Sequence, residues 1–126
     1  MTTEKVLWHR KGMALQGDEK YREALEYFEK CVKGSDPYLP ALYQAARTRI
    51  LGEFEQERAI ELLDRYIELA TANTEPSAAA AWWRKGIAYE QLGDNDKAIT
   101  SYRKSLELDR EFANAKQALE RLEASQ

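Results

Sequence analysis

The residue types that most often carry out catalysis or bind metals are scarce in this chain of 126 residues. It contains one histidine, His9, and one cysteine, Cys31, so it can form neither a pair of histidine ligands nor a cysteine cluster. A catalytic nucleophile also needs a base beside it, and Cys31 falls where a small buried residue is expected. We therefore predict no catalytic residue, no cofactor and no enzyme activity.

The segment "GDNDKA" at 93–98 resembles the start of a calcium-binding loop, because Asp94 and Asp96 lie two residues apart. Such a loop continues with an oxygen ligand and a glycine, but Ala98 and Ile99 stand at those places. A turn that caps a helix is the better interpretation, and we predict no metal site. The sequence also lacks a glycine-rich phosphate-binding loop.

Composition favours an all-helical domain with wide solvated faces. Charged residues make up 33% of the chain, and there are three prolines and six glycines. The net charge of −3 disfavours a general binder of nucleic acid or anionic membranes. No apolar run of about 18 residues and no signal peptide is visible, so we expect a cytoplasmic protein without a membrane partner.

The heptads "WHRKGMA" at 8–14 and "WWRKGIA" at 82–88 are nearly identical, and their surroundings match as well. Twelve residues after each glycine comes an alanine, then an aromatic residue and then a small one. The matched positions are Trp8, Gly12, Ala24, Phe28 and Cys31 in the first copy and Trp82, Gly86, Ala98, Tyr102 and Ser105 in the other. We interpret each glycine as a close crossing of two helices, so Gly86→Leu should be costly and Gly86→Ala mild.

Between these copies lies a third, degenerate unit. Ala46 and Ala59 take the two small positions, with Leu42 in place of the first aromatic residue. A register with Arg47 at the small position is less favourable, because a charged side chain would hold the helices apart. The unit has six extra residues, which we predict to lengthen its second helix to 56–72, with "TEPS" as the following loop.

Glycine, proline, aspartate and threonine clusters separate seven expected helices. These are 3–16, 20–34, 38–51, 56–72, 76–92, 95–108 and 110–124. The last has an apolar face and a polar face, as a terminal capping helix requires.

This pattern of small, large and aromatic positions resembles the tetratricopeptide repeat family. The resemblance implies an all-α, right-handed superhelical α-solenoid of three helix-turn-helix repeats with a seventh, capping helix. We expect one domain over 1–126, with repeats at about 5–38, 39–75 and 79–112 and the cap at about 110–124.

The resemblance also implies that the first helices of the repeats line a concave groove in which partners bind. The lining positions are His9, Arg10, Met13 and Gln16 in the first repeat, Tyr43, Gln44, Arg47 and Ile50 in the second, and Trp83, Arg84, Ile87 and Glu90 in the third. Arginines can bind carboxylates and Trp83 can act as an apolar anchor. The alternative is that Trp83 packs against the neighbouring repeat and the arginines are merely solvated.

Some family members clamp the carboxylates at the C-terminus of chaperone tails, with lysine, asparagine and arginine at five positions. The matching residues here are His9, Met13, Gln44, Ala80 and Arg84, of which only Arg84 fits. We therefore expect no clamp of that kind. Instead we predict a protein–protein interaction module that binds a peptide with an acidic part and an apolar anchor. The alternatives are a self-assembling, homo-oligomeric repeat protein, with Val6 exposed on the first helix, and a regulatory fragment of a larger protein.

Overall fold

The structure is a computed structural model that describes residues 3–125. Within that range the chain forms seven α-helices and no β-strand, which confirms the predicted all-α solenoid. The helices are α1 (Thr3–Gly17), α2 (Tyr21–Val32), α3 (Leu39–Gly52), α4 (Gln56–Leu69), α5 (Ala78–Gln91), α6 (Asn95–Leu108) and α7 (Ala113–Ala124). None of these described helices is long and apolar enough to cross a bilayer.

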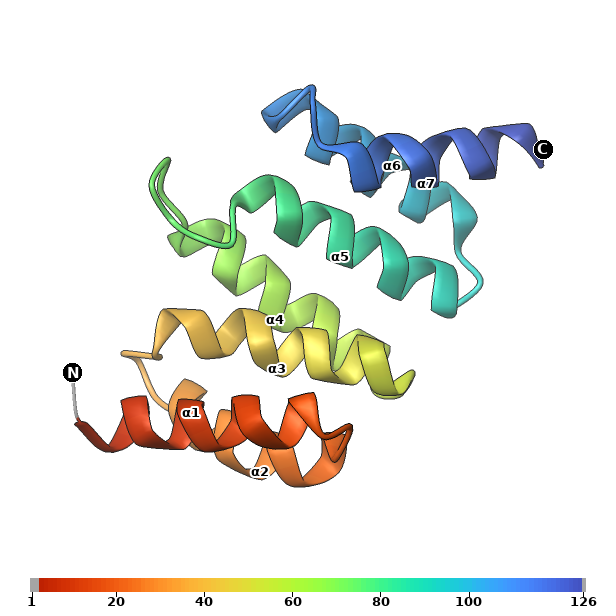
Figure 1. Cartoon of the computed structure of the whole chain (residues 1–126). Coiled ribbons are helices and arrows are strands. Elements are labelled where there is room, and N and C mark those ends of the chain that lie inside the picture. The colour runs from red at the N-terminus through yellow and green to blue at the C-terminus, as the bar shows by residue number, and fades with distance from the viewer. Residues whose placement is uncertain (1–2, 126) are drawn as a thin grey trace.

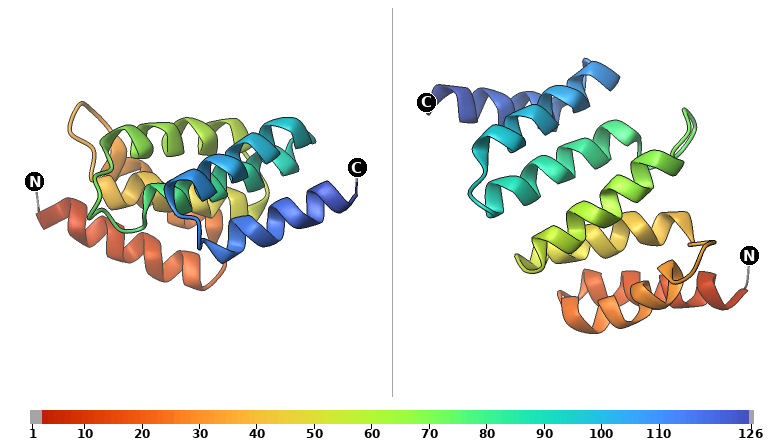
Figure 2. Two further views of the ribbon diagram at one scale, coloured as in Figure 1. Left: turned by 90° about the horizontal axis from the view of Figure 1, so that it is seen from above. Right: turned by 180° about the vertical axis from the view of Figure 1, so that it is seen from behind.

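The helices stack in two layers, as Figures 1 and 2 show. Helices α1, α3, α5 and α7 form one layer and α2, α4 and α6 form the other, with the two ends of the chain at opposite ends of the stack. Each helix packs against the next in sequence, and α3 also contacts both α1 and α5. We call the exposed side of α1, α3, α5 and α7 the odd-helix face, since the predicted groove residues lie on these helices.

The repeated glycines face aromatic rings, which corrects the expected reason for their small size. A Cβ atom at Gly12 would lie 2.6 Å from Cε1 of Phe28, and one at Gly86 would lie 2.6 Å from Cδ1 of Tyr102. Both rings are fully buried. The glycines therefore make room for a ring of the paired helix rather than for its backbone, and even an alanine at Gly86 would collide.

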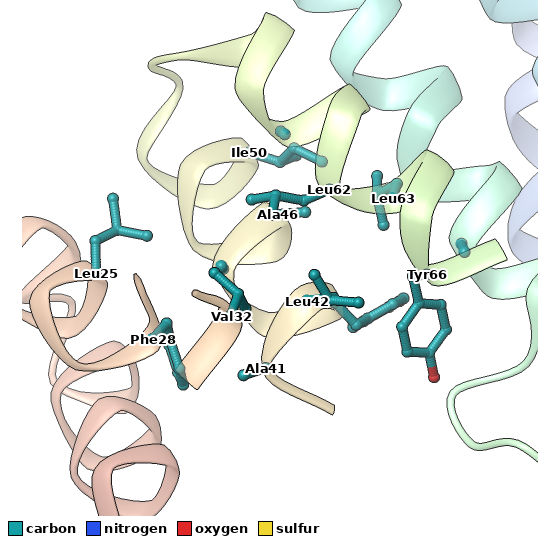
Figure 3. Packing of buried hydrophobic residues seen from close by; sticks show 14 of the residues in the cluster. Leu25, Phe28, Val32, Ala41, Leu42, Ala46, Ile50, Leu62, Leu63 and Tyr66 are labelled. Atoms are coloured by element: carbon teal, nitrogen blue, oxygen red, sulfur yellow. The ribbon is translucent and has the colours of Figure 1, made fainter. Parts of the chain in front are cut away.

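The middle repeat fills the same space with a different pair. Ala46 is fully buried at its small position, and Leu63 stands where the other repeats have Phe28 and Tyr102. A methyl group on one helix thus compensates for a smaller side chain on the other. Figure 3 shows both residues in the core, and their burial confirms the register that places Ala46, not Arg47, at the small position.

The prediction that the second helix of the middle repeat is lengthened is wrong. Helix α4 has 14 residues, as many as α6, and it ends at Leu69. The extra residues form a loop in which the Thr71 amide donates to Oγ1 of Thr74 over 2.8 Å. Threonine side chains compete with helical hydrogen bonds in this way. The hydroxyl of Tyr66 donates to the Pro76 carbonyl oxygen over 2.5 Å, which ties the loop back to α4.

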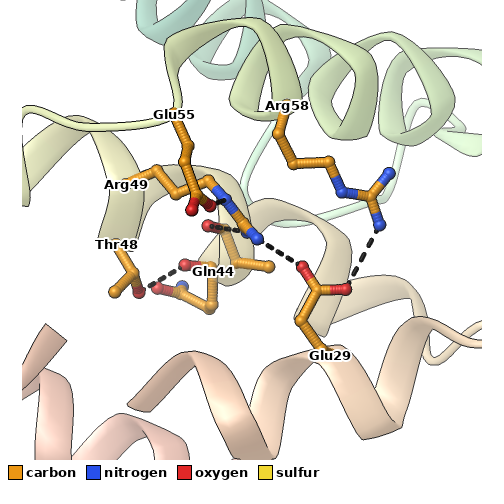
Figure 4. Close-up of polar contacts among 7 residues, drawn as sticks. Glu29, Gln44, Thr48, Arg49, Glu55 and Arg58 are labelled. Atoms are coloured by element: carbon orange, nitrogen blue, oxygen red, sulfur yellow. Dashed lines mark hydrogen bonds and ion pairs between the residues drawn. The ribbon is translucent and has the colours of Figure 1, made fainter. Parts of the chain in front are cut away.

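The middle repeat carries a buried ion network in place of apolar packing (Figure 4). Arg49 on α3 is only 5% exposed, and its guanidinium lies 2.6 Å from Glu29 on α2 and 2.8 Å from Glu55 before α4. Arg58 on α4 also reaches Glu29, over 3.2 Å. Because the one buried charge, Arg49, has two carboxylate partners, the network joins three helices without leaving a buried ion unpaired.

The core has two parts. The larger one spans α2 to α5, and the smaller one joins α6 to α7 through Tyr102, Ala115 and Leu122. Phe112, just before α7, packs against both. Helix α7 therefore covers the last repeat as the predicted cap does, with Ala115, Ala118 and Leu122 buried and its other side exposed.

Candidate functional site on the odd-helix face

A hydrogen-bonded cluster joins α1 to α3 in the predicted groove. The side-chain amide of Gln16, only 5% exposed, donates to Oε1 of Gln44 over 3.1 Å and to Oγ1 of Thr48 over 2.9 Å. Its carbonyl oxygen accepts a hydrogen bond from Nη1 of Arg47. Gln16 thus uses both ends of its amide to join α1 to α3, and its oxygen holds Arg47 in place.

Arg47 on α3 and Arg84 on α5 come together on this face. Both are half-buried. Burial lowers the pKa of Arg47, and the charge of Arg84 lowers it further, against a smaller opposing effect of Tyr43 and Tyr21. Arg84 donates from Nε to the Tyr43 hydroxyl over 3.2 Å. Among the described residues neither arginine forms an ion pair with a carboxylate, so two positive charges that are close enough to repel each other are held without an anionic partner.

Trp83 lies beside this arginine pair and is half-buried, not enclosed by the array. The Arg84 guanidinium carbon lies 4.4 Å from the centre of the Trp83 ring, a cation–π arrangement. On the cap side, Trp83 makes a tilted ring contact with Phe112 at 5.9 Å. The indole therefore connects the arginine pair to the capping helix.

A cleft of about 670 Å³ opens between α5 and α7 next to Trp83. Glu90 lies in its wall, where Arg121 of α7 donates to Oε1 over 2.9 Å and to Oε2 over 2.8 Å. The Tyr102 hydroxyl also donates to Oε2. Burial alone raises the pKa of Glu90, but the hydrogen bonds from Arg121 and Tyr102 outweigh burial and hold that pKa below its usual value.

The remaining predicted groove residues differ in how exposed their side chains are on this face. Arg10 is exposed on α1, and no contact joins it to the arginine pair. Met13 and Ile87 are half-buried and pack against the larger core. Tyr43 is only 4% exposed, so it reaches this face chiefly through the hydrogen bond that its hydroxyl accepts from Arg84.

His9 serves packing more than the groove. Its ring lies between Phe28 at 5.7 Å and Tyr38 at 5.3 Å, and its Nε2 atom is buried without a hydrogen-bond partner among the described residues. Burial lowers the pKa of His9. Cys31 is fully buried, as expected for a small packing residue, and burial raises the pKa of its thiol.

Sequence reasoning missed the contribution of α7 to this face. Arg121, Asn114 and Gln117 line the cleft, although the pattern assigned α7 to capping alone. The successive spacings of three residues from Asn114 to Gln117 and four from Gln117 to Arg121 were the available signal, since they place the three residues on one side of a helix. Residues 3–125 contain no group of three or more side chains placed to bind a metal ion.

Comparisons with known proteins agree with the fold. A family model described as tetratricopeptide repeat matches residues 6–33 and 79–112. The heat shock protein sti1 homolog of Schizosaccharomyces pombe is 30% identical over 116 residues, which are 92% of this chain and 19% of that protein. The chain thus spans about a fifth of the curated relative that it matches.

Solved structures have the same architecture. MamA from Desulfovibrio magneticus RS-1 superposes with a TM-score of 0.82 at 22% identity, covering 96% of this chain and 65% of that one. The first TPR of Spaghetti (RPAP3), bound to HSP90 peptide SRMEEVD, also has a TM-score of 0.82, at 21% identity, covering 99% of this chain and 94% of that one. The chain belongs to the tetratricopeptide repeat family, whose solenoids present extended surfaces for protein–protein interaction.

Proposed function

We propose that this chain is a non-catalytic interaction module, one domain of three repeats and a cap, that binds an acidic segment of a partner protein on the odd-helix face. The observation that carries the proposal is the pair Arg47 and Arg84, both half-buried, each without a carboxylate partner among the described residues, and near enough for the charge of Arg84 to lower the pKa of Arg47.

The energetics favour an anionic ligand at this pair. Two like charges in a partly desolvated site repel each other, and neutral acceptors such as Gln16 and the Tyr43 hydroxyl offset this only in part. A carboxylate placed between the guanidinium groups would remove the repulsion and add charge-assisted hydrogen bonds. Arg47 and Arg84 are therefore proposed to bind the acid, with Trp83 as an apolar anchor beside them.

The test uses short synthetic peptides, capped at both ends, that carry aspartate or, as matched controls, asparagine. We expect the aspartate peptides to bind more tightly and to lose this advantage as salt is added. Replacing Arg47 and Arg84 together by glutamine should abolish the difference, a loss of about tenfold or more in affinity. Arg110→Gln is the matched control, because Arg110 is exposed and lies in the turn between α6 and α7.

Two results would contradict the proposal. One is equal binding of aspartate and asparagine peptides to the unchanged protein. The other is an aspartate preference that survives the double replacement but is lost in Arg110→Gln. That result would place the anion site at the turn between α6 and α7. Circular dichroism of each variant checks that helicity is retained.

The ligand of the Spaghetti domain, SRMEEVD, provides a separate test of the chaperone-tail clamp. Of the five clamp positions only Arg84 fits, and His9 is packed between two rings. We therefore expect no specific recognition of a free C-terminal carboxylate. SRMEEVD and its C-terminal amide should bind with affinities within about threefold of each other. A tenfold preference for the free acid would instead support a chaperone-tail clamp.

Self-assembly is a second proposal. The predicted Val6 is half-buried rather than exposed, but its neighbour Leu7 is 50% exposed on α1 and supports the proposal instead. Sedimentation over a range of protein concentrations distinguishes the two functions. A dimer that Leu7→Ser dissociates would favour assembly through this end of the solenoid, whereas a monomer at all concentrations would remove the support for it.

A further inference from the structure

We propose that the cleft between α5 and α7 is a second subsite, which takes an uncharged aliphatic or aromatic side chain of the same partner segment. This inference rests on the proposed function, because it assigns the neighbour of the acid bound by Arg47 and Arg84. It specifies where the apolar side chain of the partner binds, what kind of side chain that is, and how far it lies from the acidic residue.

The shape of the cleft suits a side chain. Its volume of about 670 Å³ leaves ample room for one side chain, and the cleft is open to solvent, so a segment lying on the surface can reach it. Trp83 and Ile87 contribute apolar surface from α5, and Ala118 contributes it from α7. Because Ala118 is small, the wall formed by α7 recedes at this point, where a longer residue would fill the space.

The charges in the cleft are already paired, which excludes a charged occupant. Both carboxylate oxygens of Glu90 accept hydrogen bonds from Arg121, and one also accepts from Tyr102. An incoming carboxylate would lose its hydration and meet Glu90, and an incoming cation would have to displace Arg121. An apolar side chain avoids both penalties and gains from leaving water.

The rim of the cleft can hold a peptide backbone. Asn114 and Gln117 are exposed on α7, one turn apart, and their side-chain amides offer both donors and acceptors. The structure gives neither amide a side-chain hydrogen bond within the described residues. They are therefore available to the backbone of a segment that inserts its side chain between α5 and α7.

The two subsites lie close enough for one short segment. Arg84 of the anion site stacks on the Trp83 ring at 4.4 Å, and Trp83 also lines the cleft, so the two subsites adjoin at this ring. An extended chain advances by about 3.3 Å per residue, which places the acidic and apolar residues of the partner about one to three positions apart. The occupant is thus an extended peptide with an aspartate or glutamate near a leucine-like residue.

Four capped glycine- and serine-rich peptides test this inference. They carry aspartate and leucine about two positions apart, aspartate and serine, asparagine and leucine, or asparagine and serine. Affinity is measured by titration, and NMR follows the indole N–H signal of Trp83. We expect replacement of leucine by serine to weaken binding about tenfold, and only leucine peptides to shift the Trp83 signal strongly.

Variants separate the two subsites. Gln117→Trp should obstruct the cleft and abolish the leucine effect while the aspartate effect remains. Lys116→Trp, on the opposite side of α7, is the control and should leave both effects. Ile87→Ala removes part of the apolar wall and should reduce the leucine effect, and Arg47→Gln should reduce only the aspartate effect.

The outcomes distinguish failure of the cleft from failure of the proposed function. If aspartate strengthens binding but leucine does not, or if the leucine effect survives both Gln117→Trp and Ile87→Ala, the anchor subsite is refuted and the anion site stands. If leucine strengthens binding and aspartate does not, acid recognition is refuted and the cleft is supported alone. A dimer in sedimentation that Gln117→Trp dissociates would assign the cleft to a second copy of the chain, and would overturn the inference.

Discussion

Gly86→Ala is the substitution that tests the packing of the repeats most directly. The new methyl group would lie 2.6 Å from Cδ1 and Cζ of the Tyr102 ring, well inside van der Waals contact. That ring is fully buried and its hydroxyl is bonded to Glu90, so moving the ring would disturb both its packing and that hydrogen bond. Overpacking of this kind destabilises a protein by about 1–3 kcal/mol.

An opposing effect must be included. Alanine favours a helix over glycine by about 1 kcal/mol, which reduces the net loss for Gly86→Ala to at most about 2 kcal/mol. Gly17→Ala is the matched control, since a Cβ atom there meets nothing within 4 Å and the residue ends α1. We expect it to be neutral or slightly stabilising. Urea denaturation followed by circular dichroism gives both free energies of unfolding.

A double variant tests the physical cause. Gly86→Ala combined with Tyr102→Leu recreates the pair Ala46 and Leu63 of the middle repeat, so the alanine should be tolerated better against leucine than against tyrosine. The coupling free energy should be about 1 kcal/mol or more. The reasoning is refuted if Gly86→Ala is as stable as Gly17→Ala, or if the double variant loses the full sum of the two single effects.

Two further predictions concern stability. The pKa of His9 is lowered by burial, so folding disfavours its protonated form. The contribution of His9 to stability is therefore full above its ordinary pKa of about 6.5 and is lost as the pH falls below that value. The urea midpoint should be lower at pH 5.5 than at pH 7.5, and His9→Phe should remove this difference. Glu53 and Glu55 have positive φ angles of 56° and 50°, a conformation that favours glycine. Glu53→Gly should therefore stabilise the protein by about 0.5–1 kcal/mol in thermal unfolding. Glu55→Gly should not, because it removes the ion pair with Arg49.

The repeat pattern was sufficient to predict most of the architecture. Small and aromatic residues at fixed separations are packing residues, and packing within a helix pair is a local property of the sequence. Thus the burial of Ala46 and the cap formed by α7 followed from spacing alone. The end of α4 did not, because the apolar periodicity continues past Leu69 while hydrogen bonds between Thr71 and Thr74 favour a turn.

The candidate site was harder to predict because it depends on pairs of residues that are distant in sequence. The Arg121 guanidinium reaches Glu90 across 31 residues, and Arg84 reaches Tyr43 across 41. No periodicity within one helix encodes these contacts. The sequence could place Glu90 on the right side of its helix, but it gave no sign that this carboxylate is already neutralised by α7.

The buried and half-buried cations of this chain differ in whether a carboxylate pairs with them, and this difference distinguishes structural charges from candidate binding residues. Arg49 is paired with Glu29 and Glu55, and Lys85, 7% exposed, lies 2.5 Å from Asp64 on the neighbouring helix. Stability explains these ions, because removal of a partner would leave a buried charge unpaired. Arg47 is only two residues from Arg49 and, within the described residues, has no such carboxylate. A solenoid that needed only to fold would gain nothing by keeping Arg47 and Arg84 near each other without a carboxylate, whereas the acid-binding surface that we propose needs that uncompensated charge before its partner arrives.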